Sequence, residues 1–180
     1  MVSTTSQSFP KPRVAITITF IINGIVTGTL FSRIADYKHL LGVSNFIFGL
    51  ALLSVSIGVL TAIGPGGKLS AKYGSSRVAI PATVFLSFTI IAISLSKHYW
   101  QFVISLFLFG AAGAIQDVAM NTHAITVEHK YGKKYMSAFH GSWSLGTFTA
   151  TIFGGLMAQL KVSTFIHALI ISIFSLILIA

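Results

Sequence analysis

Asp117 and Asn121 lie four residues apart in an otherwise largely apolar stretch, GAIQDVAMNTHAITVEHK, at positions 113–130. The whole chain has only three acidic residues, Asp36, Asp117 and Glu128. A charged carboxylate at the centre of a membrane-spanning helix costs about 2.5–3.5 kcal/mol on insertion scales, so such a residue usually marks a functional pathway. Two interpretations are open. Asp117 either joins neighbouring helices through hydrogen bonds, or lines a water-filled cavity where its carboxyl group takes up and releases a proton.

The composition indicates an integral membrane protein. The chain has 180 residues, of which 54% are hydrophobic and 8% charged, whereas a soluble domain has about 25% charged residues. The net charge of +9 argues little for nucleic-acid binding, because the basic residues lie in the gaps between apolar runs, where membrane topology places them. The chain has no cysteine, which excludes disulfides and thiolate metal sites.

Six apolar segments predict six transmembrane helices, and hence an all-α membrane protein. A spanning helix needs about 20 residues, and each segment is close to that length or longer. Residues 1–13 are expected to form a disordered cytoplasmic tail, and residues 14–180 a six-helix transmembrane bundle. The first segment is too long for the apolar core of a cleaved signal peptide, and further spans follow it. The segments are 14–31, 44–63, 78–95, 100–127, 137–160 and 162–180.

The distribution of basic residues predicts the orientation of the bundle. Lysine and arginine are enriched in the cytoplasmic connections of membrane proteins. The majority lies on the side of the N-terminus, which places that end in the cytoplasm and the protein in the cell (inner) membrane, with several passes. On that side are Lys11, Arg13, Lys68, Lys72, Arg77, Lys130, Lys133 and Lys134, and on the other side Arg33, Lys38, Lys97 and Lys161.

A stripe of small and polar residues runs along the fourth segment at helical spacing. Small residues permit close helix packing, so the stripe should face protein or a cavity rather than lipid. Its members follow one another in steps of three or four residues, as on one face of a helix. They are Gly110, Gly113, Asp117, Asn121, Ala124 and Glu128.

The start of the fifth segment, FHGSWSLG at 139–146, supplies further polar candidates. With a rise of 1.5 Å per residue, Asn121 lies about 9 Å and His140 about 8 Å inside the membrane. Asp117 and Ser144 match in depth in the same way, so these four side chains are expected to form a polar cluster in the cytoplasmic half of the bundle. His140 either relays protons, having an ordinary pKa of about 6.5, or caps the helix start.

Two other side chains could line the same space. Trp143 either stacks on a substrate ring or packs against helices and lipid. Asn23 lies beside Gly24 and Gly28 in the first segment and either lines the cavity or serves helix packing. Arg33 and Asp36 could pair at the outer end of that segment, but the pair is expected to be exposed, where ion pairs contribute little.

The remaining histidines show no metal-ligand spacing with acids or with one another. No nucleophile–base pairing and no phosphate-binding loop is found. The sequence therefore predicts no enzyme, no metal site and no cofactor.

A basic, glycine-rich connection, GPGGKLSAKYGSSRV at 64–78, lies between the second and third segments. Its pattern G-x-L-x-x-K-x-G-x-x-R resembles the loop signature that the major facilitator superfamily carries at this place. The resemblance implies a fold of two six-helix bundles around a substrate cavity, each bundle made of two three-helix repeats. This chain would then be the N-terminal bundle, with the C-terminal bundle absent from it. The motif residues are Gly67, Leu69, Lys72, Gly74 and Arg77.

One position departs from that family pattern. Ala71 stands where the superfamily commonly has an aspartate thought to help latch the closed cytoplasmic side. That gating role cannot be transferred to this chain.

The fourth segment resembles the fucose permease branch of the superfamily. QDVAMNTH, at 116–123, has an acid and an asparagine in equivalent places, which implies a protonatable Asp117 and a hydrogen-bonding Asn121 in the cavity. That permease also uses an acid in its first span, where this chain has Phe31 nearby, so sugar specificity does not transfer. The chain is more similar to a poorly characterised bacterial branch, which shares the pattern D-V-A-M-N followed by F-H-G-x-W-S-L-G.

These features imply half of a secondary active transporter that moves a small polar solute, such as a sugar, by alternating access coupled to protons. The solute would bind between this half and the missing half, or between two copies of this chain, within membrane lipid. One alternative is a proton-driven efflux pump for amphipathic compounds, although the fifth segment lacks the proline expected of one. Another is a truncated or structural six-span protein without transport activity. Nothing in the sequence identifies the substrate, the direction of transport or the coupling ion.

Overall fold

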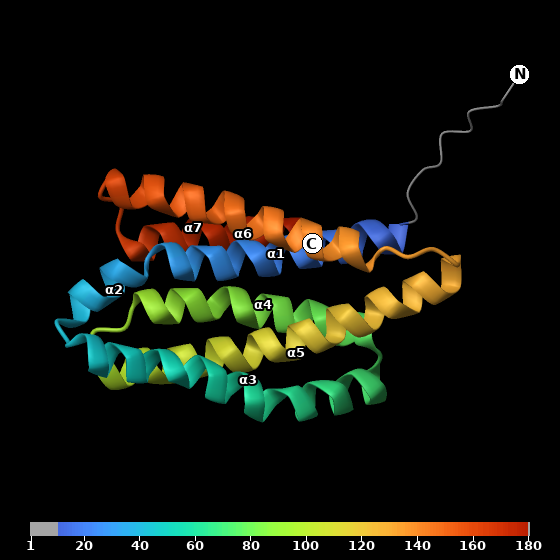
Figure 1. Ribbon diagram of the computed structural model, residues 1–180, viewed down its shortest axis with the longest axis horizontal. Helices are drawn as coiled ribbons and strands as arrows, with labels where there is room; N and C mark the ends of the chain where they lie inside the picture. The colour runs from blue at the N-terminus through green and yellow to red at the C-terminus, as the bar shows by residue number, and fades with distance from the viewer. Residues whose placement is uncertain (1–10, 180) are drawn as a thin grey trace, which may run out of the picture.

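The computed structural model describes residues 11–179, which form helices joined by short connections (Figure 1). The prediction of an all-α chain is confirmed over this range. Each of the six apolar segments corresponds to one long helix, and a short helix, α2, follows the first. The helices are α1 (Lys11–Ser32), α2 (Ile34–Leu41), α3 (Asn45–Tyr73), α4 (Ser75–Ser94), α5 (Tyr99–Tyr131), α6 (Met136–Gln159) and α7 (Thr164–Ile179).

Several predicted boundaries were wrong. Residues 11–13, expected in a disordered tail, belong to α1, while residues 1–10 and Ala180 lie outside the described range. α3 continues ten residues past its predicted end, and α5 extends beyond its segment at both ends. The polar and basic residues at the end of α5 lowered the hydropathy but do not break a helix. The continuation of α3 begins with glycines and Pro65, which usually indicate a turn.

Four of the helices within residues 11–179 are long and apolar enough to cross a membrane, namely Pro12–Ser32, Asn45–Tyr73, Ser75–Ser94 and Tyr99–Tyr131. α6 has sufficient length, but its serines, threonines and glycines make it less apolar. α7 is strongly apolar but has 16 residues. The count of six spans therefore stays a prediction.

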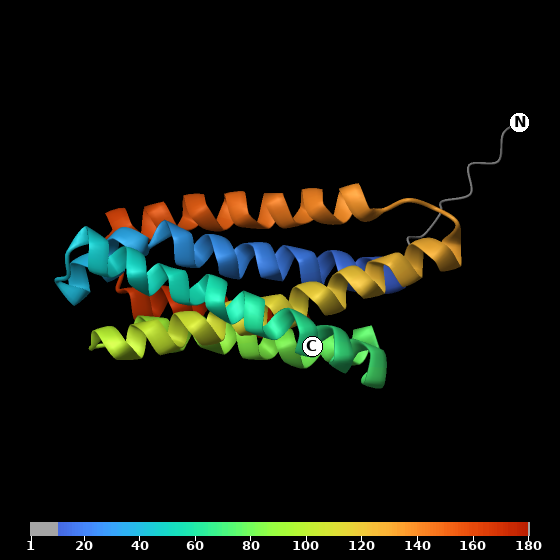
Figure 2. The ribbon, with the colours of Figure 1, turned by 60° about the horizontal axis from the view of Figure 1, so that its bottom comes forward.

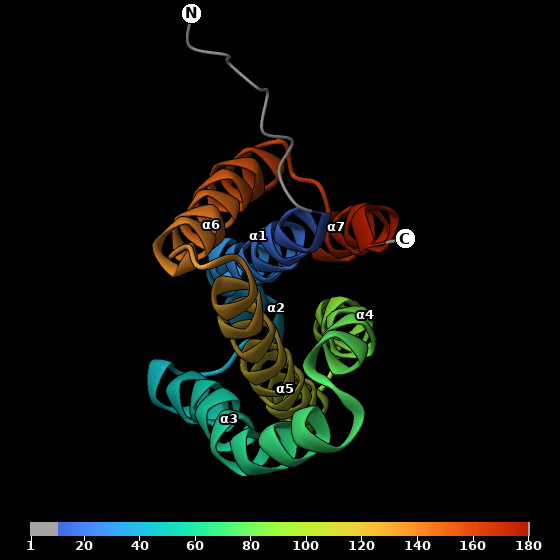
Figure 3. The ribbon, with the colours of Figure 1, turned by 90° about the vertical axis from the view of Figure 1, so that its right-hand side faces the viewer.

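The long helices run side by side along the long axis of the molecule, and successive ones alternate in direction (Figures 1 and 2). The α3–α4 and α5–α6 connections lie at the end where α1 begins, which we call the N-terminal end. α2 and the α4–α5 and α6–α7 connections lie at the opposite end. Seen end-on, α6, α1 and α7 form one group and α3, α5 and α4 the other (Figure 3). Contacts of α4 with α7 and of α1 with α5 join the two groups.

Glycines bring the backbones of two helix pairs close together. A Cβ atom on Gly58 of α3 would overlap the Phe107 carbonyl oxygen and lie 2.9 Å from the Ala111 nitrogen of α5. In the α1–α6 pair, a Cβ on Gly146 would lie 2.6 Å from the Ile21 carbonyl oxygen, and one on Gly28 would lie 2.5 Å from that of Thr147. Small residues at helix contacts are the usual means of close packing in lipid.

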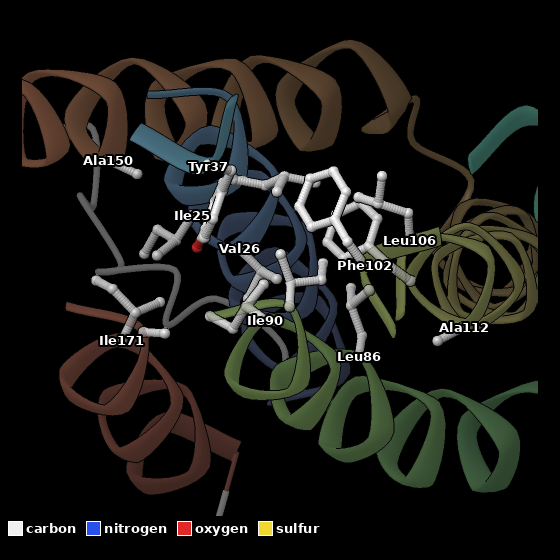
Figure 4. Packing of buried hydrophobic residues seen from close by; sticks show 14 of the residues in the cluster. Ile25, Val26, Tyr37, Leu86, Ile90, Phe102, Leu106, Ala112, Ala150 and Ile171 are labelled. Atoms are coloured by element: carbon white, nitrogen blue, oxygen red, sulfur yellow. The ribbon is translucent and has the colours of Figure 1, made fainter. Parts of the chain in front are cut away.

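The apolar core lies between the two groups of helices. Val26 of α1, Ile90 of α4 and Phe102 of α5 come together there (Figure 4), and each is at most 1% exposed. Tyr37 of α2 packs on Phe102, with ring centroids 5.7 Å apart. The core therefore draws α2, which the hydropathy pattern did not predict, back onto the bundle.

The glycine-rich connection at 64–78 is mostly helical, so the prediction of a loop over these residues was wrong. Gly67, Leu69 and Lys72 belong to α3, Arg77 belongs to α4, and only Gly74 is non-helical between them. Pro65 lies inside α3, and a proline is tolerated in a membrane helix where local adjustments satisfy the freed carbonyl. Gly74 alone makes the turn, with a φ of 88° that residues with side chains avoid.

Arg33 is buried at the opposite end of the bundle, so the prediction of an exposed ion pair was wrong. It pairs with Asp36 across one turn, and their side chains are 5% and 39% exposed. The guanidinium also donates a 2.8 Å hydrogen bond to the Val162 carbonyl, and its Nη1 lies 3.5 Å from His167 Nδ1 of α7. The α6–α7 connection folds over this end and covers Arg33, which no local pattern reveals.

The glycine contacts lead to a prediction for α3. Gly58→Ala should lower the melting temperature of the protein in detergent micelles, because the new methyl group separates α3 from α5. Gly49 lies on the same helix, and a Cβ there would meet open space. Gly49→Ala should therefore leave the melting temperature unchanged or raise it, because alanine has the better helix propensity. Equal effects of the two substitutions would show that close contact at Gly58 does not stabilise the bundle.

Candidate functional site

A cavity of about 420 Å³ lies among α1, α3, α5 and α6, with Leu86 of α4 in its wall. Most of its lining is apolar and includes Phe31, Phe109 and valines of α3. The polar members of the lining are Asn23, Thr27, Asp117, His140 and Trp143.

Asp117 is an exposed residue of α5 that borders the cavity. Asn121, one turn further along, donates hydrogen bonds to its carboxylate Oδ1 (3.0 Å) and to its backbone carbonyl (2.9 Å). Asn121 itself is not part of the cavity lining. The two residues therefore form a pair in which the amide holds the carboxylate that faces the cavity.

His140, near the start of α6, lines the same cavity as Asp117. Its ring meets the Phe20 ring edge-on, with centroids 5.3 Å apart. Ser144 lies outside the lining, and its hydroxyl donates to the His140 carbonyl within α6. Two of the four residues expected to cluster, Asp117 and His140, thus line the same cavity. Asn121 bonds Asp117 from outside the lining, and Ser144 bonds its own helix.

Trp143 and Asn23 belong to a chain of hydrogen bonds that runs from the cavity wall into the bundle. The indole Nε1 donates to Asn23 Oδ1 at 2.7 Å, and Asn23 Nδ2 donates to Gln116 Oε1 at 2.9 Å. Gln116 Nε2 then donates to Thr83 Oγ1 at 2.7 Å. The chain crosses α6, α1, α5 and α4 in turn.

Gln116 and Thr83 were missed as candidate residues. Gln116 is fully buried and Thr83 is 1% exposed. Gln116 could have been noticed as a polar residue beside Asp117 in an apolar helix. Thr83 gives no such signal, because threonines are common in membrane helices and usually bond their own backbone.

The stripe predicted on α5 divides along its length. Gly110, Gly113 and Asp117 border the cavity. Gly110 also packs against α3, where a Cβ would overlap the Val55 carbonyl oxygen. Ala124 is fully buried among α1 and α6 residues. Glu128 accepts hydrogen bonds from the backbone nitrogens of Tyr135 and Met136, where α6 begins.

Two residues of the basic glycine-rich motif border a separate groove. Leu69 of α3 and Arg77 of α4 line it with Tyr73 and Phe85, and its volume is about 350 Å³. Lys72 lies over the Tyr73 ring, 5.0 Å from its centroid. The motif therefore sits at the N-terminal end of the bundle, away from the cavity.

Across residues 11–179, no three His, Asp or Glu side chains gather as metal ligands would. The cavity combines a carboxylate, an imidazole, an indole ring and an amide within an apolar wall. These groups can hydrogen-bond a solute, stack against its apolar face and exchange a proton with it or with water.

Comparison with known proteins gives a consistent family. Residues 16–180 match the family described as Major Facilitator Superfamily. An uncharacterized transporter of Sinorhizobium fredii is 32% identical over 86% of this chain and 41% of its own length. An uncharacterized MFS-type transporter of Yersinia pestis is 33% identical over 82% of the chain and 38% of its own length. The membrane protein MosC of Rhizobium meliloti is 27% identical over 81% and 36%.

A water-filled cavity predicts that a thiol in its wall reacts with a water-soluble reagent more readily than a thiol on the outer surface of the bundle. The chain has no native cysteine, so Gly113→Cys introduces a single thiol at the cavity wall. In membrane vesicles this thiol should react with a charged methanethiosulfonate reagent, because water permits formation of the reactive thiolate. Ile152→Cys on α6 is a control, since Ile152 is 59% exposed and lies outside the cavity. Equal labelling of both positions, or no labelling of Gly113→Cys, would contradict a water-filled cavity.

Proposed function

The chain belongs to the major facilitator superfamily, and on that premise we propose that it is one half of a secondary active transporter for a small polar solute. The family supports a transport role rather than an enzymatic one. The chain spans about two fifths of the length of the curated relatives it matches. Transport by alternating access would therefore involve a second six-helix bundle, or a second copy of this chain, facing the cavity.

Coupling to protons is supported by the presence of Asp117 and His140 in the lining of one cavity. A carboxylate and an imidazole are the side chains that most often relay protons within membranes. Asn121 holds the carboxylate through a 3.0 Å hydrogen bond. Protonation of Asp117 removes the charge of its carboxylate and weakens the bond from Asn121. Binding of a proton would therefore change how Asn121 holds Asp117 at the cavity wall.

The orientation of the bundle also belongs to this proposal. The N-terminal end of the bundle carries the α3–α4 and α5–α6 connections, and most of the lysines and arginines lie there. By the excess of basic residues in cytoplasmic connections, we place this end in the cytoplasm and the protein in the cell (inner) membrane. Anionic lipid headgroups would then meet the basic residues near Gly74.

A second candidate function is proton-driven efflux of amphipathic compounds. It is favoured by the wall of the cavity, where apolar residues, among them Phe31, Phe109, Leu86 and Met120, outnumber the polar ones. Against it, α6 contains glycines but no proline, so the proline expected in the corresponding span of such pumps is missing. We therefore rank uptake of a polar solute first.

Asp117→Asn should abolish solute-driven proton movement while leaving the protein in the membrane. The test follows alkalinisation of a weakly buffered suspension of cells that express the complete transporter, after addition of monosaccharides, L-fucose among them. Asp117→Glu should retain proton movement, because it keeps a carboxyl group. Thr126→Val is a control on the same helix, since Thr126 is exposed and bonds only the Thr122 carbonyl.

Proton movement that persists in Asp117→Asn would remove this residue from the coupling. Ethidium added in place of the sugars tests the second function. Proton-dependent ethidium export without any response to sugars would favour the efflux pump.

A further inference from the structure

The hydrogen bonds between Thr83 and Trp143 all point in one donor-to-acceptor direction. Thr83 sets that direction. A threonine hydroxyl has one hydrogen and lone pairs that accept. Thr83 donates that hydrogen to the Ala79 carbonyl at 2.8 Å. Towards Gln116 it can therefore only accept, and the Gln116 nitrogen, not its oxygen, must face Thr83.

This constraint passes from one amide to the next. With its nitrogen held by Thr83, Gln116 presents its oxygen to Asn23, which must answer with its own nitrogen. The Asn23 oxygen is then left facing α6, where it accepts from Trp143. An indole nitrogen can only donate, so the two ends of the chain demand the same direction.

Burial preserves this order. Gln116 is fully buried, Thr83 is 1% exposed and Asn23 is 8% exposed, so water has little access to the bonds that Gln116 makes to Thr83 and Asn23. Thr83 and Gln116 do not line the cavity, whereas Asn23 and Trp143 do. The chain thus connects α4, which contributes only Leu86 to the cavity, with two polar groups of the cavity wall.

We propose that Thr83 and Gln116 are positioning residues that hold the Asn23 amide and the Trp143 indole in a single orientation in the wall of the solute cavity. The proposal rests on the proposed function only in treating this cavity as the solute site. Pre-organised groups bind a solute without first losing rotational freedom. If Thr83 and Gln116 served only helix packing, the orientation of Trp143 would not depend on them. The response of Trp143 to their replacement therefore distinguishes positioning from packing.

The experiment observes the indole directly. The chain has two tryptophans, so Trp100→Phe leaves Trp143 as the single ¹⁵N-indole signal in the NMR spectrum of the micelle-bound protein. In this background, Thr83→Val keeps the side-chain shape but removes the acceptor for Gln116. The Trp143 Nε1–H resonance should move upfield or split in two, and its exchange with water should accelerate. Thr83→Ser restores the hydroxyl and should return the original resonance.

Thr89→Val is the matched control. Thr89 lies on the same helix, is 3% exposed, and donates only to the Leu86 carbonyl of its own helix. Its replacement should leave the Trp143 resonance unchanged. If Thr83→Val does not fold, Gln116→Met interrupts the same chain and is judged by the same signal.

A Trp143 resonance that stays at its original position in the folded Thr83→Val or Gln116→Met protein would overturn the proposal. So would an equal shift in Thr89→Val. None of these measurements requires transport, so failure of the proposed function and failure of this proposal give different results. Loss of proton movement in Asp117→Asn, together with an unchanged Trp143 resonance in Thr83→Val, would contradict only the positioning role.

Discussion

The need to satisfy polar groups away from water governs the arrangement of this bundle. In lipid, a polar group without a hydrogen-bond partner costs several kcal/mol. Most hydroxyls in the helices meet this need locally, as Thr29 does by donating to the Ile25 carbonyl one turn earlier. Asn23 and Gln116 cannot be satisfied in this way, and they find partners on other helices. Asp117 and His140 border the cavity instead.

Close backbone packing makes these long-range bonds possible. A Cβ atom on Gly24 would overlap the carbonyl oxygen of Trp143, so the glycine allows α1 and α6 to approach at the level of the chain. Asn23 precedes Gly24 directly, which places its amide within reach of the Trp143 indole. On the other side of α5, Gly58 and Gly110 bring α3 close. The small residues thus set the helix spacing on which both the chain and the cavity depend.

Local patterns in the sequence were sufficient for the helices and for part of the site. Hydropathy located the six long helices, and the four-residue spacing of Asp117 and Asn121 placed them on one face of α5, where the structure shows them bonded. Asn23 was recognised because it stands beside Gly24 and Gly28. Each of these features depends on residues within a few turns of one another.

The features that were missed depend on contacts between residues far apart in the chain. Arg33 is buried because it meets Val162 and His167, more than 125 residues later. Thr83 and Gln116 are 33 residues apart, and their bond follows from how α4 lies against α5. The helical continuation of α3 through Pro65 was missed for another reason, since glycine and proline indicate a turn in water but are tolerated in membrane helices.

The central claim is that the Asp117 carboxyl group faces a water-filled cavity, and infrared spectroscopy of the protein in lipid bilayers tests it most directly. With only three acidic residues in the chain, the carboxyl band lost in Asp117→Asn can be assigned to Asp117. We expect this band to change with the pH of the bulk solution and to shift rapidly when D₂O replaces water. A band that responds to neither change would show a carboxyl group sealed among helices or turned towards lipid, and would contradict the account.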